Sequence, residues 1–575
     1  MIHRLTLLSL LALWCSSCSS ENASPSSPAE GEEAKAETAE LQADVVVYGD
    51  AAVGVAAAVQ AARMDKSVIL VSQYGHLGGM TSSGLGWTDI GNSRILGGIS
   101  REFYHRVYLH YQDEDAWVYQ TLEKFPKKGQ GTSAFDDENQ LGSVFEPKVA
   151  EMIFDQLVEE AGVQVIDGRI DQKAGTVMDG KRIASIRLED GREIQGKMFI
   201  DASYEGDLLP LAGVSFTVGR EANSKYNEKS NAITLPVHKN NLPDGIDPYL
   251  VKGDPDSGLL PDVNPYDEDD VGKGDHRLQA FCYRMCLTNA EENLIPIEKP
   301  GGYDEADYEI LFRALDAGYR GQWGAFYKFS PMPNKKTDSN NNGGISTDYI
   351  GMNYSPLPPD HEDYWDWTTL THDERDALAD KHKQWQLGLV WTLQNHPKVP
   401  EGVRKQYSGW GLPKDEFVDN GHWPYNLYVR EGRRMVSDFV MTEHQCRQNK
   451  EYPQVEDSIG MGAYTMDSHH VQRVNWKGQL KNEGDIQRSL GGKAYPISYR
   501  SIVPAEGECE NLLVPWCLSS SHIAFGSIRM EPVGMVLGQS AATAAVQAID
   551  AGISVQEVDY AKLRERLLED GQALE

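Results

Sequence analysis

The sequence reads ADVVVYGDAAVGVAAAVQAARMDKSVILVSQ over residues 43–73. Residues 44–48 are a largely β-branched apolar run, which is the pattern of a parallel strand buried on both faces. Residues 55–64 are rich in alanine and favour a helix, and residues 67–71 repeat the buried-strand pattern. The order strand, turn, helix, strand within about 30 residues predicts a Rossmann-type α/β unit.

The turn before this helix has the pattern G-x-A-x-x-G, from Gly49 to Gly54. Gly49 permits the tight reversal, Ala51 stands where a second glycine is usual, and Gly54 lets the helix pack close to the strand. The helix N-terminus, including Ala52 and Val53, offers N–H groups and a positive potential to a diphosphate. The turn therefore predicts a dinucleotide site, with a ligand-free βαβ unit as the alternative.

The second strand lacks the acid that usually ends it. An Asp or Glu at this place holds the adenosine ribose in related units, whereas this chain has Ser72 and Gln73. We expect the Ser72 hydroxyl or the Gln73 amide to bond the ribose instead. Because the acid is missing, the turn alone leaves open which dinucleotide binds.

A glycine-rich loop, GHLGGMTSSG, follows the second strand at residues 75–84. It resembles the FAD-binding loop of glutathione-reductase-like flavoproteins. Over about residues 43–550, the chain resembles a family of exported bacterial FAD-dependent oxidoreductases, some of which carry the label xanthan lyase. The motifs behind this resemblance are LGWTD (85–89), FIDASYEGD (199–207), GRE (219–221), FCYR (281–284), YVRE (428–431) and residues 521–539.

The resemblance implies non-covalent FAD and indicates which residues meet it. These are His76, Gly78, Gly79 and Met80 in the glycine-rich loop, Val165 at a strand edge near the adenine, Asp201 and Ala202, and Gly534 and Met535 in a helix aimed at the flavin pyrimidine. A covalent link through the His76 imidazole is an alternative. Covalent-histidine flavoproteins of the succinate-dehydrogenase type, however, place that histidine farther upstream.

The FAD-binding fold is discontinuous in the sequence. A helix at 146–161, a strand at 163–166, a hairpin at 181–195 and a strand at 197–200 continue it, and a strand at 511–514 and an Ala-rich helix at 534–549 complete it. Between the two parts the content of Trp, Tyr, Pro and Asp rises. We predict an α/β fold, glutathione-reductase-like, with a large inserted α+β substrate domain. The predicted boundaries are 43–221 and 490–555 for the FAD-binding domain, 222–489 for the inserted domain and 556–575 for a C-terminal helix.

Residues 1–18 have the features of an export signal with a lipobox. The apolar residues 5–14 are too few to span a bilayer, which needs about 20, but they suit the apolar region of a signal peptide. Small residues precede Cys18, which predicts lipidation there; ordinary cleavage without a lipid is the alternative. Residues 19–42 are rich in Ser, Pro, Ala and Glu and are expected to be a disordered linker. We expect an exported protein, either periplasmic or anchored to the outer membrane as a lipoprotein.

The net charge of −32 disfavours nucleic acid and anionic membrane surfaces as partners. The expected partners are a small-molecule substrate and an electron acceptor that the sequence does not identify, with membrane contact only through the lipid. Cysteines beyond the leader form no C-x-x-C pair, so we predict no metal site. They are Cys282, Cys286, Cys446, Cys509 and Cys517. No second G-x-G-x-x-G follows a strand, so no nicotinamide domain is expected.

Two residues near the last strand are candidates for catalysis. His522 comes shortly after that strand, where it would face the isoalloxazine, and a histidine side chain suits proton transfer near neutral pH. Arg529 is expected to bind a substrate oxyanion or the flavin. For His522 the alternative is a hydrogen-bonding residue in a loop, and for Arg529 a salt bridge to Glu531 or another acid.

Polar residues of the inserted segment are further candidates. Arg430, Arg433 and Arg434 either clamp a substrate carboxylate or form structural pairs, for example with Glu431. His469, His470 and Tyr464 are the acid–base groups to consider if His522 is not the base. Asp467 and the two histidines lack a third spaced ligand for a metal.

We interpret the chain as an FAD-dependent oxidoreductase that acts on a C–H bond of a small polar organic molecule. Tryptophan and tyrosine in the inserted segment favour a carbohydrate-related substrate, because aromatic rings stack on sugar faces. A flavin-dependent lyase or isomerase without net redox is one alternative. A non-enzymatic surface binding protein that retains a Rossmann shell is another.

Overall fold

The computed structural model describes residues 41–129, 132–237, 240–320 and 326–575. The predicted leader, Cys18 and the linker as far as residue 40 lie outside the described residues. The first described element, β1 (Leu41–Tyr48), starts two residues before the expected start at residue 43, and it pairs with β8 (Glu193–Asp201) from Leu41. Residues Leu41–Glu575 form one compact unit, and the domain boundaries within it stay a prediction.

The central sheet confirms the predicted α/β fold. Its strands run in the order β5 (Gln164–Asp167), β2 (Val68–Ser72), β1, β8, β7 (Arg182–Arg187) and β6 (Thr176–Asp179), and the short β23 (Leu512–Leu513) also pairs with β8. β1 is parallel to β2 and β8, β2 to β5, and β8 to β23, whereas β7 is antiparallel to both of its neighbours, β6 and β8. β2 pairs with one edge of β1 and β8 with the other, so the strand order reverses at β1. The carboxyl ends of β1, β2 and β8 therefore border the crevice where such sheets bind ligands.

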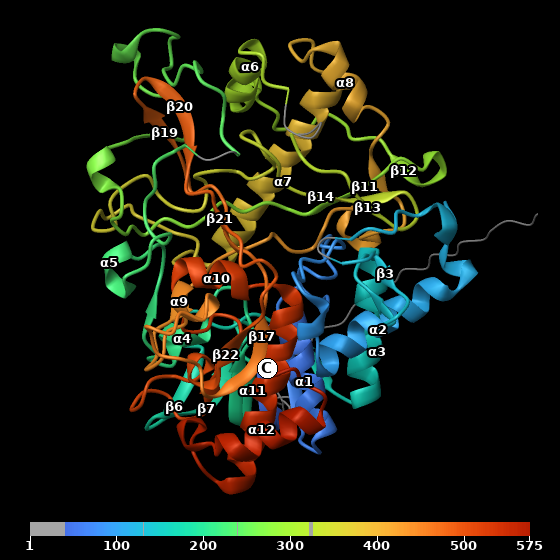
Figure 1. The fold of residues 1–575 in the computed structure, drawn as a ribbon, viewed down its shortest axis with the longest axis vertical. Helices are drawn as coiled ribbons and strands as arrows, with labels where there is room; N and C mark the ends of the chain where they lie inside the picture. Colours follow the sequence, from blue (N-terminus) through green and yellow to red (C-terminus); the bar gives the residue numbers. More distant parts are fainter. Residues whose placement is uncertain (1–40, 130–131, 238–239, 321–325) are drawn as a thin grey trace, which may run out of the picture. The chain divides into compact units, whose positions relative to one another are not determined.

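Two helices from opposite ends of the chain pack side by side on this sheet, α1 (Ala52–Arg63) and α11 (Glu531–Ala551) (Figure 1). The two helices approach closely at Gly538, which has no side chain. A Cβ there would lie only 2.1 Å from the Val53 carbonyl oxygen. The helices α2 (Gly98–Gln112) and α3 (Pro147–Ala161) also contact α1. The chain therefore leaves the sheet after β8 and returns to complete it, as the sequence predicted.

Some element boundaries differ from the prediction. The hairpin over 181–195 and the strand over 197–200 share one continuous strand, β8, because residues 194–201 pair with β1 along their whole length. β7 pairs with the first part of β8 and β23 with its last part. α11 begins at Glu531 rather than Gly534, since Pro532 is tolerated in a first turn. The C-terminal helix is shorter than residues 556–575: α12 spans Tyr560–Glu569, after a 3₁₀ turn at Val555–Glu557.

The inserted segment consists of small sheets around one long helix, α7 (His372–Asn395), which begins with a capping box between Thr371 and Glu374. The three-stranded sheets join β10 (Val263–Pro265), β19 (Gln472–Trp476) and β20 (Gln479–Glu483), and β11 (Met285–Thr288), β14 (Lys336–Ser339) and β13 (Ser330–Met332). Two-stranded pairs inside the segment are β12 (Leu294–Ile295) with β15 (Leu412–Pro413) and β18 (Met466–Ser468) with β21 (Ile486–Arg488). The segment also contributes β16 (Arg434–Met435) to a pair with β9 (Phe216–Thr217) and β17 (Ser458–Gly462) to a pair with β22 (Tyr495–Ser498). One pair, β3 (Phe135–Asp136) with β4 (Leu141–Gly142), lies outside it. Short helices are α4 (Leu208–Leu211), α5 (Asn223–Tyr226), α6 (Glu309–Asp316), α8 (Glu401–Tyr407), α9 (Glu443–Cys446) and α10 (His522–Ile528).

The five predicted thiols are all buried and free. Within the described ranges, no helix is both long and apolar enough to cross a bilayer. One group of carboxylates in the described part of the chain has the geometry of a metal site: Glu146, Asp415 and Glu416. Lys336 Nζ lies 2.7 Å from Glu146 and 2.8 Å from Asp415, so an ammonium group already occupies the place that a metal ion would take among these carboxylates.

Candidate functional site

The turn between β1 and α1 has the geometry of a diphosphate cradle. Gly49 adopts φ +114°, and a Cβ at Gly54 would lie 2.0 Å from the Gly49 carbonyl oxygen, so both positions need glycine. No side chain caps α1, and the N–H groups of Ala52 and Val53 find no acceptor among the described residues. Because buried N–H groups are nearly always paired, the cradle suits an anionic group such as the diphosphate of FAD.

The end of β2 is arranged differently from the expectation. Ser72 Oγ donates to Asp50 Oδ2 at 2.7 Å and accepts from the Gly75 N–H at 2.9 Å. The Gln73 amide donates to the Tyr48 hydroxyl at 2.6 Å. Both side chains predicted to bond the ribose are thus engaged within the protein, and a carboxylate from the turn lies beside them.

The glycine-rich loop lies directly against this turn. Gly78 forms a bridge with Ala51, and a Cβ at Gly79 would lie 2.9 Å from Ala51 Cα. The Met80 N–H donates to the Tyr204 hydroxyl at 2.8 Å, and that hydroxyl donates to Glu531 at 2.8 Å. The structure therefore brings the loop, the turn and the start of α11 to one place.

His76 has a partner at each ring nitrogen and on one ring face. Its Nδ1 lies 2.7 Å from Glu151, its Nε2 lies 3.6 Å from Asp419, and its ring stacks on Tyr425 at 3.3 Å. Two carboxylates thus flank the two ring nitrogens, which disfavours the covalent alternative. Val165 is exposed on β5 at the edge of the sheet.

The remaining predicted cofactor residues pack against the turn or stabilise its surroundings. Asp201, at the end of β8, accepts from the Ser203 hydroxyl at 2.6 Å and the Leu208 N–H at 2.9 Å. Burial raises the pKa of Asp201 to about 6. Ala202 touches both glycines of the turn, while a Cβ at Gly534 would meet the Trp516 ring at 2.8 Å. Met535 is fully buried.

A cavity of about 230 Å³ opens at the carboxyl ends of these strands. The sheet part contributes Tyr74, Arg169, Tyr204 and Glu205, and the inserted segment contributes Tyr283, Trp367, Arg375, Trp423 and Tyr425 among others. Its volume suits one ring system with its ribose rather than a complete FAD. The cavity therefore accounts for one part of a bound dinucleotide.

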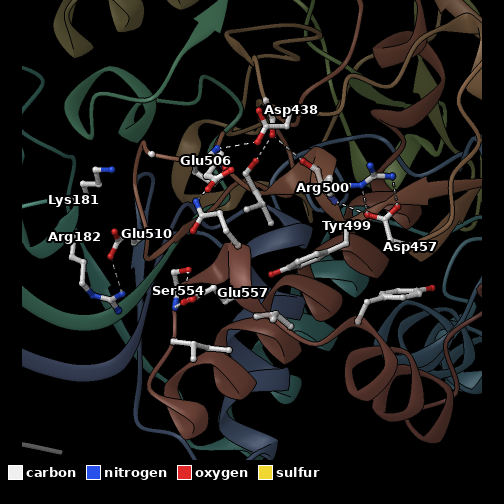
Figure 2. Close-up of a pocket in the computed structure, with 18 of the residues that line it drawn as sticks. Lys181, Arg182, Asp438, Asp457, Tyr499, Arg500, Glu506, Glu510, Ser554 and Glu557 are labelled. Carbon is white, nitrogen blue, oxygen red and sulfur yellow. Dashed lines mark hydrogen bonds and ion pairs between the residues drawn. The ribbon is translucent and has the colours of Figure 1, made fainter.

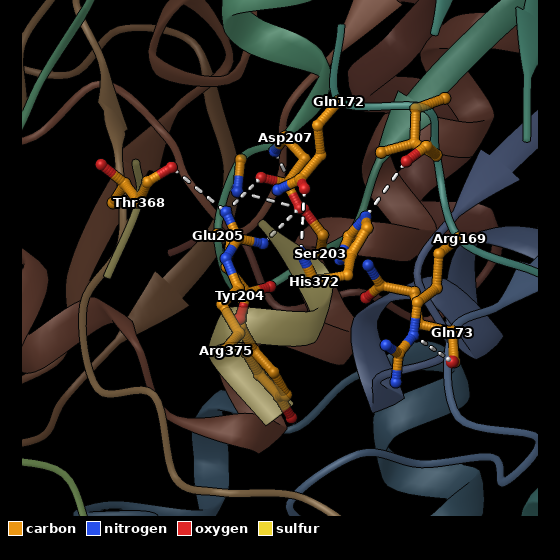
Figure 3. Close-up of polar contacts among 12 residues, drawn as sticks. Gln73, Arg169, Gln172, Ser203, Tyr204, Glu205, Asp207, Thr368, His372 and Arg375 are labelled. Carbon is orange, nitrogen blue, oxygen red and sulfur yellow. Dashed lines mark hydrogen bonds and ion pairs between the residues drawn. The ribbon is translucent and has the colours of Figure 1, made fainter. Parts of the chain in front are cut away.

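A buried ion-pair network forms one wall of this cavity (Figure 3). Arg375, on α7, donates to both Asp207 oxygens at 2.8 and 2.9 Å, and Arg433 donates to the same carboxylate at 2.9 Å. Glu205 accepts from the Trp367 indole at 3.2 Å, and burial raises the pKa of Glu205 to about 7. The network connects the inserted segment to the loop after β8.

A larger cavity, of about 1080 Å³, lies elsewhere (Figure 2). None of the predicted cofactor or catalytic residues lines it. Its lining includes six acids, Asp438, Glu456, Asp457, Glu506, Glu510 and Glu557, against Lys181, Arg182 and Arg500. This excess of acids disfavours a diphosphate, so size alone does not mark the cofactor site.

A second group of polar residues surrounds Arg529, which ends α10 just before α11. Arg529 donates to the Tyr428 hydroxyl at 2.8 Å, and its buried Nε has no hydrogen-bond partner among the described residues. Asp467 lies 4.0 Å from this guanidinium and 3.6 Å from His469 Nε2. His469 Nδ1 lies 2.9 Å from Asp348, which Arg430 contacts at 3.0 Å. We call these six residues the His469 cluster: Arg529, Tyr428, Asp467, His469, Asp348 and Arg430.

His522 is fully buried and has both nitrogens engaged. Nδ1 lies 2.8 Å from Glu431 and Nε2 lies 2.9 Å from the Ser468 hydroxyl. Burial, together with the nearby Arg434, lowers the pKa of His522 to about 3. His522 is therefore neutral near pH 7, and this geometry favours a structural role over proton transfer.

The structure connects His522 to the His469 cluster through Gln279. Its amide donates to Glu431 at 2.9 Å, and its oxygen accepts from the His469 N–H at 3.1 Å. Of the other candidates, Arg433 pairs with Asp207 and Arg434 pairs with Glu221 and Glu431. These are structural pairs, so neither arginine is available as a carboxylate clamp. His470 is buried beside Asp485, 3.6 Å away.

Several residues at these sites did not emerge as candidates from the sequence. Tyr204, Asp89 and Tyr428 lie in the motifs of the family resemblance, and Asp50 lies within the turn itself, so each carried a signal. Burial raises the pKa of Asp89 to about 6, and its buried Oδ1 has no partner. Asp348 carried no signal, because its contact with His469 joins positions 121 residues apart.

Comparisons with known proteins agree with the cradle. A family model described as FAD dependent oxidoreductase matches residues 44–567. No curated protein matches the chain. Among solved structures, L-amino acid deaminase from Proteus vulgaris is 15% identical, with 31% of this chain and 51% of that chain covered and a TM-score of 0.22. The 3-ketosteroid-delta4-(5alpha)-dehydrogenase from Rhodococcus jostii is 17% identical, with 31% and 50% covered and a TM-score of 0.19. The chain thus spans about half the length of both structures, and at these scores neither likeness bears on the function.

Proposed function

Because the chain belongs to the family of FAD dependent oxidoreductases, we propose that it oxidises a C–H bond of a small polar organic molecule that bears a hydroxyl group. FAD is the cofactor, as the sequence predicted. The turn, with the unpaired N–H groups of Ala52 and Val53, would hold the diphosphate. The start of α11 would lie toward the flavin end.

FAD supplies, when bound, the acceptor for the hydride that leaves the substrate carbon. The protein must position the substrate and remove the hydroxyl proton, so that an alcohol carbon becomes a carbonyl. In our proposal His469 takes this proton at Nε2, which lies 3.6 Å from Asp467 and so beyond a normal hydrogen bond. Asp348 orients the ring by accepting from Nδ1.

Arg529 and Tyr428 complete the proposed site. The Arg529 Nε has no partner and is buried, so it is a donor available to a substrate oxygen. Burial raises the pKa of Tyr428, although the nearby Arg529, Arg430 and Arg284 lower it. Tyr428 therefore acts as a neutral hydrogen-bonding group rather than as a base.

The observation that carries this proposal is the position of the His469 cluster. It lies where the inserted segment meets the α10–α11 junction, and α11 packs on the α1 helix of the cradle. Asp348, Tyr428, Asp467 and His469 come from the inserted segment and Arg529 from the sheet part. We therefore propose that the substrate meets the flavin here, beside the start of α11.

A carbohydrate-related substrate is the finer proposal. The inserted segment is rich in tryptophan and tyrosine, and one of these rings, Tyr428, belongs to the His469 cluster. Flat apolar rings beside polar groups suit sugar faces and their hydroxyls.

We also propose that the protein is exported and anchored through a lipid at Cys18.

The test is anaerobic mixing of the purified yellow protein with a panel of sugars, sugar acids and hydroxy acids. We expect at least one compound to bleach the flavin absorbance and to appear as its carbonyl product. Consumption of a compound without bleaching would instead indicate a lyase or isomerase. No reaction across the panel, with FAD bound, would contradict the carbohydrate-related class.

A further inference from the structure

The adenosine end of the cradle has a carboxylate in an unusual place. In related units an acid at the end of the second strand holds the ribose, but β2 ends at Ser72, followed by Gln73. In this structure the Asp50 side chain reaches that position from within the glycine turn. Its Oδ2 accepts from the Ser72 hydroxyl at 2.7 Å, the Gln73 N–H at 2.9 Å and the Tyr74 N–H at 3.1 Å.

These three donors fix the carboxylate but leave one of its oxygens available. Oδ1 has no hydrogen-bond partner in another residue of the described chain, although only 3% of Asp50 is exposed. Burial raises the pKa of Asp50, whereas the Ser72 hydroxyl and the backbone N–H groups of Tyr74, Gln73 and Asp50 itself lower it. An additional donor at Oδ1 would therefore stabilise the charged form further.

Asp50 is also next to the diphosphate cradle in the chain. Ala51 ends the turn, and the unpaired N–H groups of Ala52 and Val53 follow. A dinucleotide whose diphosphate meets these N–H groups brings its adenosine ribose toward β2 in this fold. Tyr74 and Arg169 line the adjoining cavity on that side.

We propose that Asp50 holds the adenosine ribose of FAD, accepting from its hydroxyl groups through Oδ1, in place of the acid missing from the end of β2. The inference rests on the proposed function only in requiring bound FAD. It assigns to a turn residue the task that a strand-end residue performs in related units. Ser72 and Gln73 then position the carboxylate rather than bind the cofactor.

One rival acid lies at the same sheet edge. Asp167 ends β5, pairs with Ser72 across the sheet and is exposed to solvent. No donor fixes its carboxylate among the described residues in the way that three donors fix Asp50. Asp167→Asn is therefore the matched control, because it removes one negative charge from the same edge.

The test measures FAD affinity rather than activity. The holoprotein is stripped of flavin, and FAD is titrated back by flavin fluorescence for the wild type, Asp50→Asn and Asp167→Asn. The asparagine oxygen can keep the three internal hydrogen bonds, but its amide nitrogen cannot accept from a ribose hydroxyl. We expect Asp50→Asn to raise the dissociation constant about 10- to 100-fold and Asp167→Asn to change it less than threefold.

A second titration separates a ribose contact from a purely structural role. The probe is FAD whose adenosine ribose lacks the 2′-hydroxyl. If Asp50 bonds the ribose, this loss weakens binding in the wild type but has a smaller effect in Asp50→Asn. Equal weakening in both proteins, or unchanged FAD affinity in Asp50→Asn, would overturn the inference.

An exchange of the two residues keeps the test decisive if Asp50→Asn folds poorly. Asp50→Ser combined with Ser72→Asp returns the acid to the strand end. We expect this double variant to bind FAD more tightly than Asp50→Ser alone, and no recovery would count against a ribose-holding acid. Failure of the wild type to bind FAD would overturn the proposed function as well, which distinguishes the two.

Discussion

Burial distinguishes two histidines of one hydrogen-bond network. His522 has no exposed surface, lies between Glu431 and Ser468, and is neutral because burial lowers its pKa to about 3. The His469 side chain is 12% exposed and has a carboxylate on each side. A proton acceptor must reach substrate and exchange its proton with solvent. In our proposal His469 serves this role because it is partly exposed, whereas His522 is fully buried with both nitrogens engaged.

We expect His469→Gln to slow anaerobic flavin reduction by a substrate from the panel about 10²–10⁴-fold, the usual contribution of a positioned base. His522→Gln should reduce at nearly the wild-type rate. It should instead lower the free energy of unfolding by about 1–3 kcal/mol, because a buried hydrogen-bonded group is disturbed. Stopped-flow absorbance and thermal unfolding measure the two effects. A slow His522→Gln beside a fast His469→Gln would reverse the assignment.

At the scale of elements, the start of α11 brings together parts of the chain that are far apart in sequence. Glu531, in its first turn, accepts from Tyr204, which follows β8, and from Thr81 in the glycine-rich loop at 3.2 Å. Burial raises the pKa of Glu531 to about 7, although both hydrogen bonds lower it. In the unfolded chain a glutamate titrates near about 4.3. Protonated Glu531 thus stabilises the folded state fully at pH values below the pKa of the unfolded chain. This contribution is lost as pH rises through the folded pKa of about 7.

We therefore expect Glu531→Gln to gain stability relative to the wild type as pH rises. Between pH 5.5 and pH 8 the difference in unfolding free energy should shift in favour of the variant by about 1–3 kcal/mol. Chemical denaturation at both pH values measures it. Glu565→Gln, at an exposed position of α12, is the control and should show no such shift. A difference that is constant with pH would contradict the assigned ionisation.

Local pattern was enough to predict β1, α1, β2 and α3, because each is a continuous apolar or amphipathic run. It failed at β8, where the pattern predicted a hairpin over 181–195 and a separate strand over 197–200. The pairing with β1, more than 140 residues earlier in the chain, makes the strand continuous. The surroundings of His522 were beyond local pattern for the same reason, because its burial depends on Glu431 and Ser468 of the inserted segment.

At the scale of the whole molecule, the chain divides into a leader that lies outside the described residues and a folded unit from Leu41 onward. Cys18 is the proposed lipid site. Cys18→Ala should move the protein from the membrane fraction to the soluble fraction after export, with its flavin content unchanged. Fractionation and flavin absorbance check this. A wild-type protein that is already soluble after export would contradict lipidation.

The inserted segment is connected to the sheet part by a buried carboxylate. Asp207, just after β8, binds Arg375 of α7 through both oxygens and Arg433 through one. Burial acts to raise the pKa of Asp207, but the two arginines hold it well below its usual range. The stabilisation by Asp207 is therefore present at pH values above its pKa in the unfolded chain, about 3.9. It would be lost only when pH falls through its lower pKa in the folded protein. It should not change between pH 5.5 and pH 8, unlike that of Glu531.

Removing this carboxylate leaves two guanidinium groups buried without their partner. Breaking a buried pair in this way costs about 3–5 kcal/mol of unfolding free energy. The unfolding temperature of Asp207→Ala should therefore be lower than that of the wild type, and the decrease should be the same at pH 5.5 and at pH 8. Arg187→Ala, which removes an exposed pair with Glu193 at 3.3 Å, should cost no more than about 1 kcal/mol. Because the pair joins the two parts at the cavity wall, limited proteolysis of Asp207→Ala should cut the segment 222–489 earlier than the sheet part. A variant that melts with the wild type and resists protease equally would show that the inserted segment is held by its apolar contacts instead.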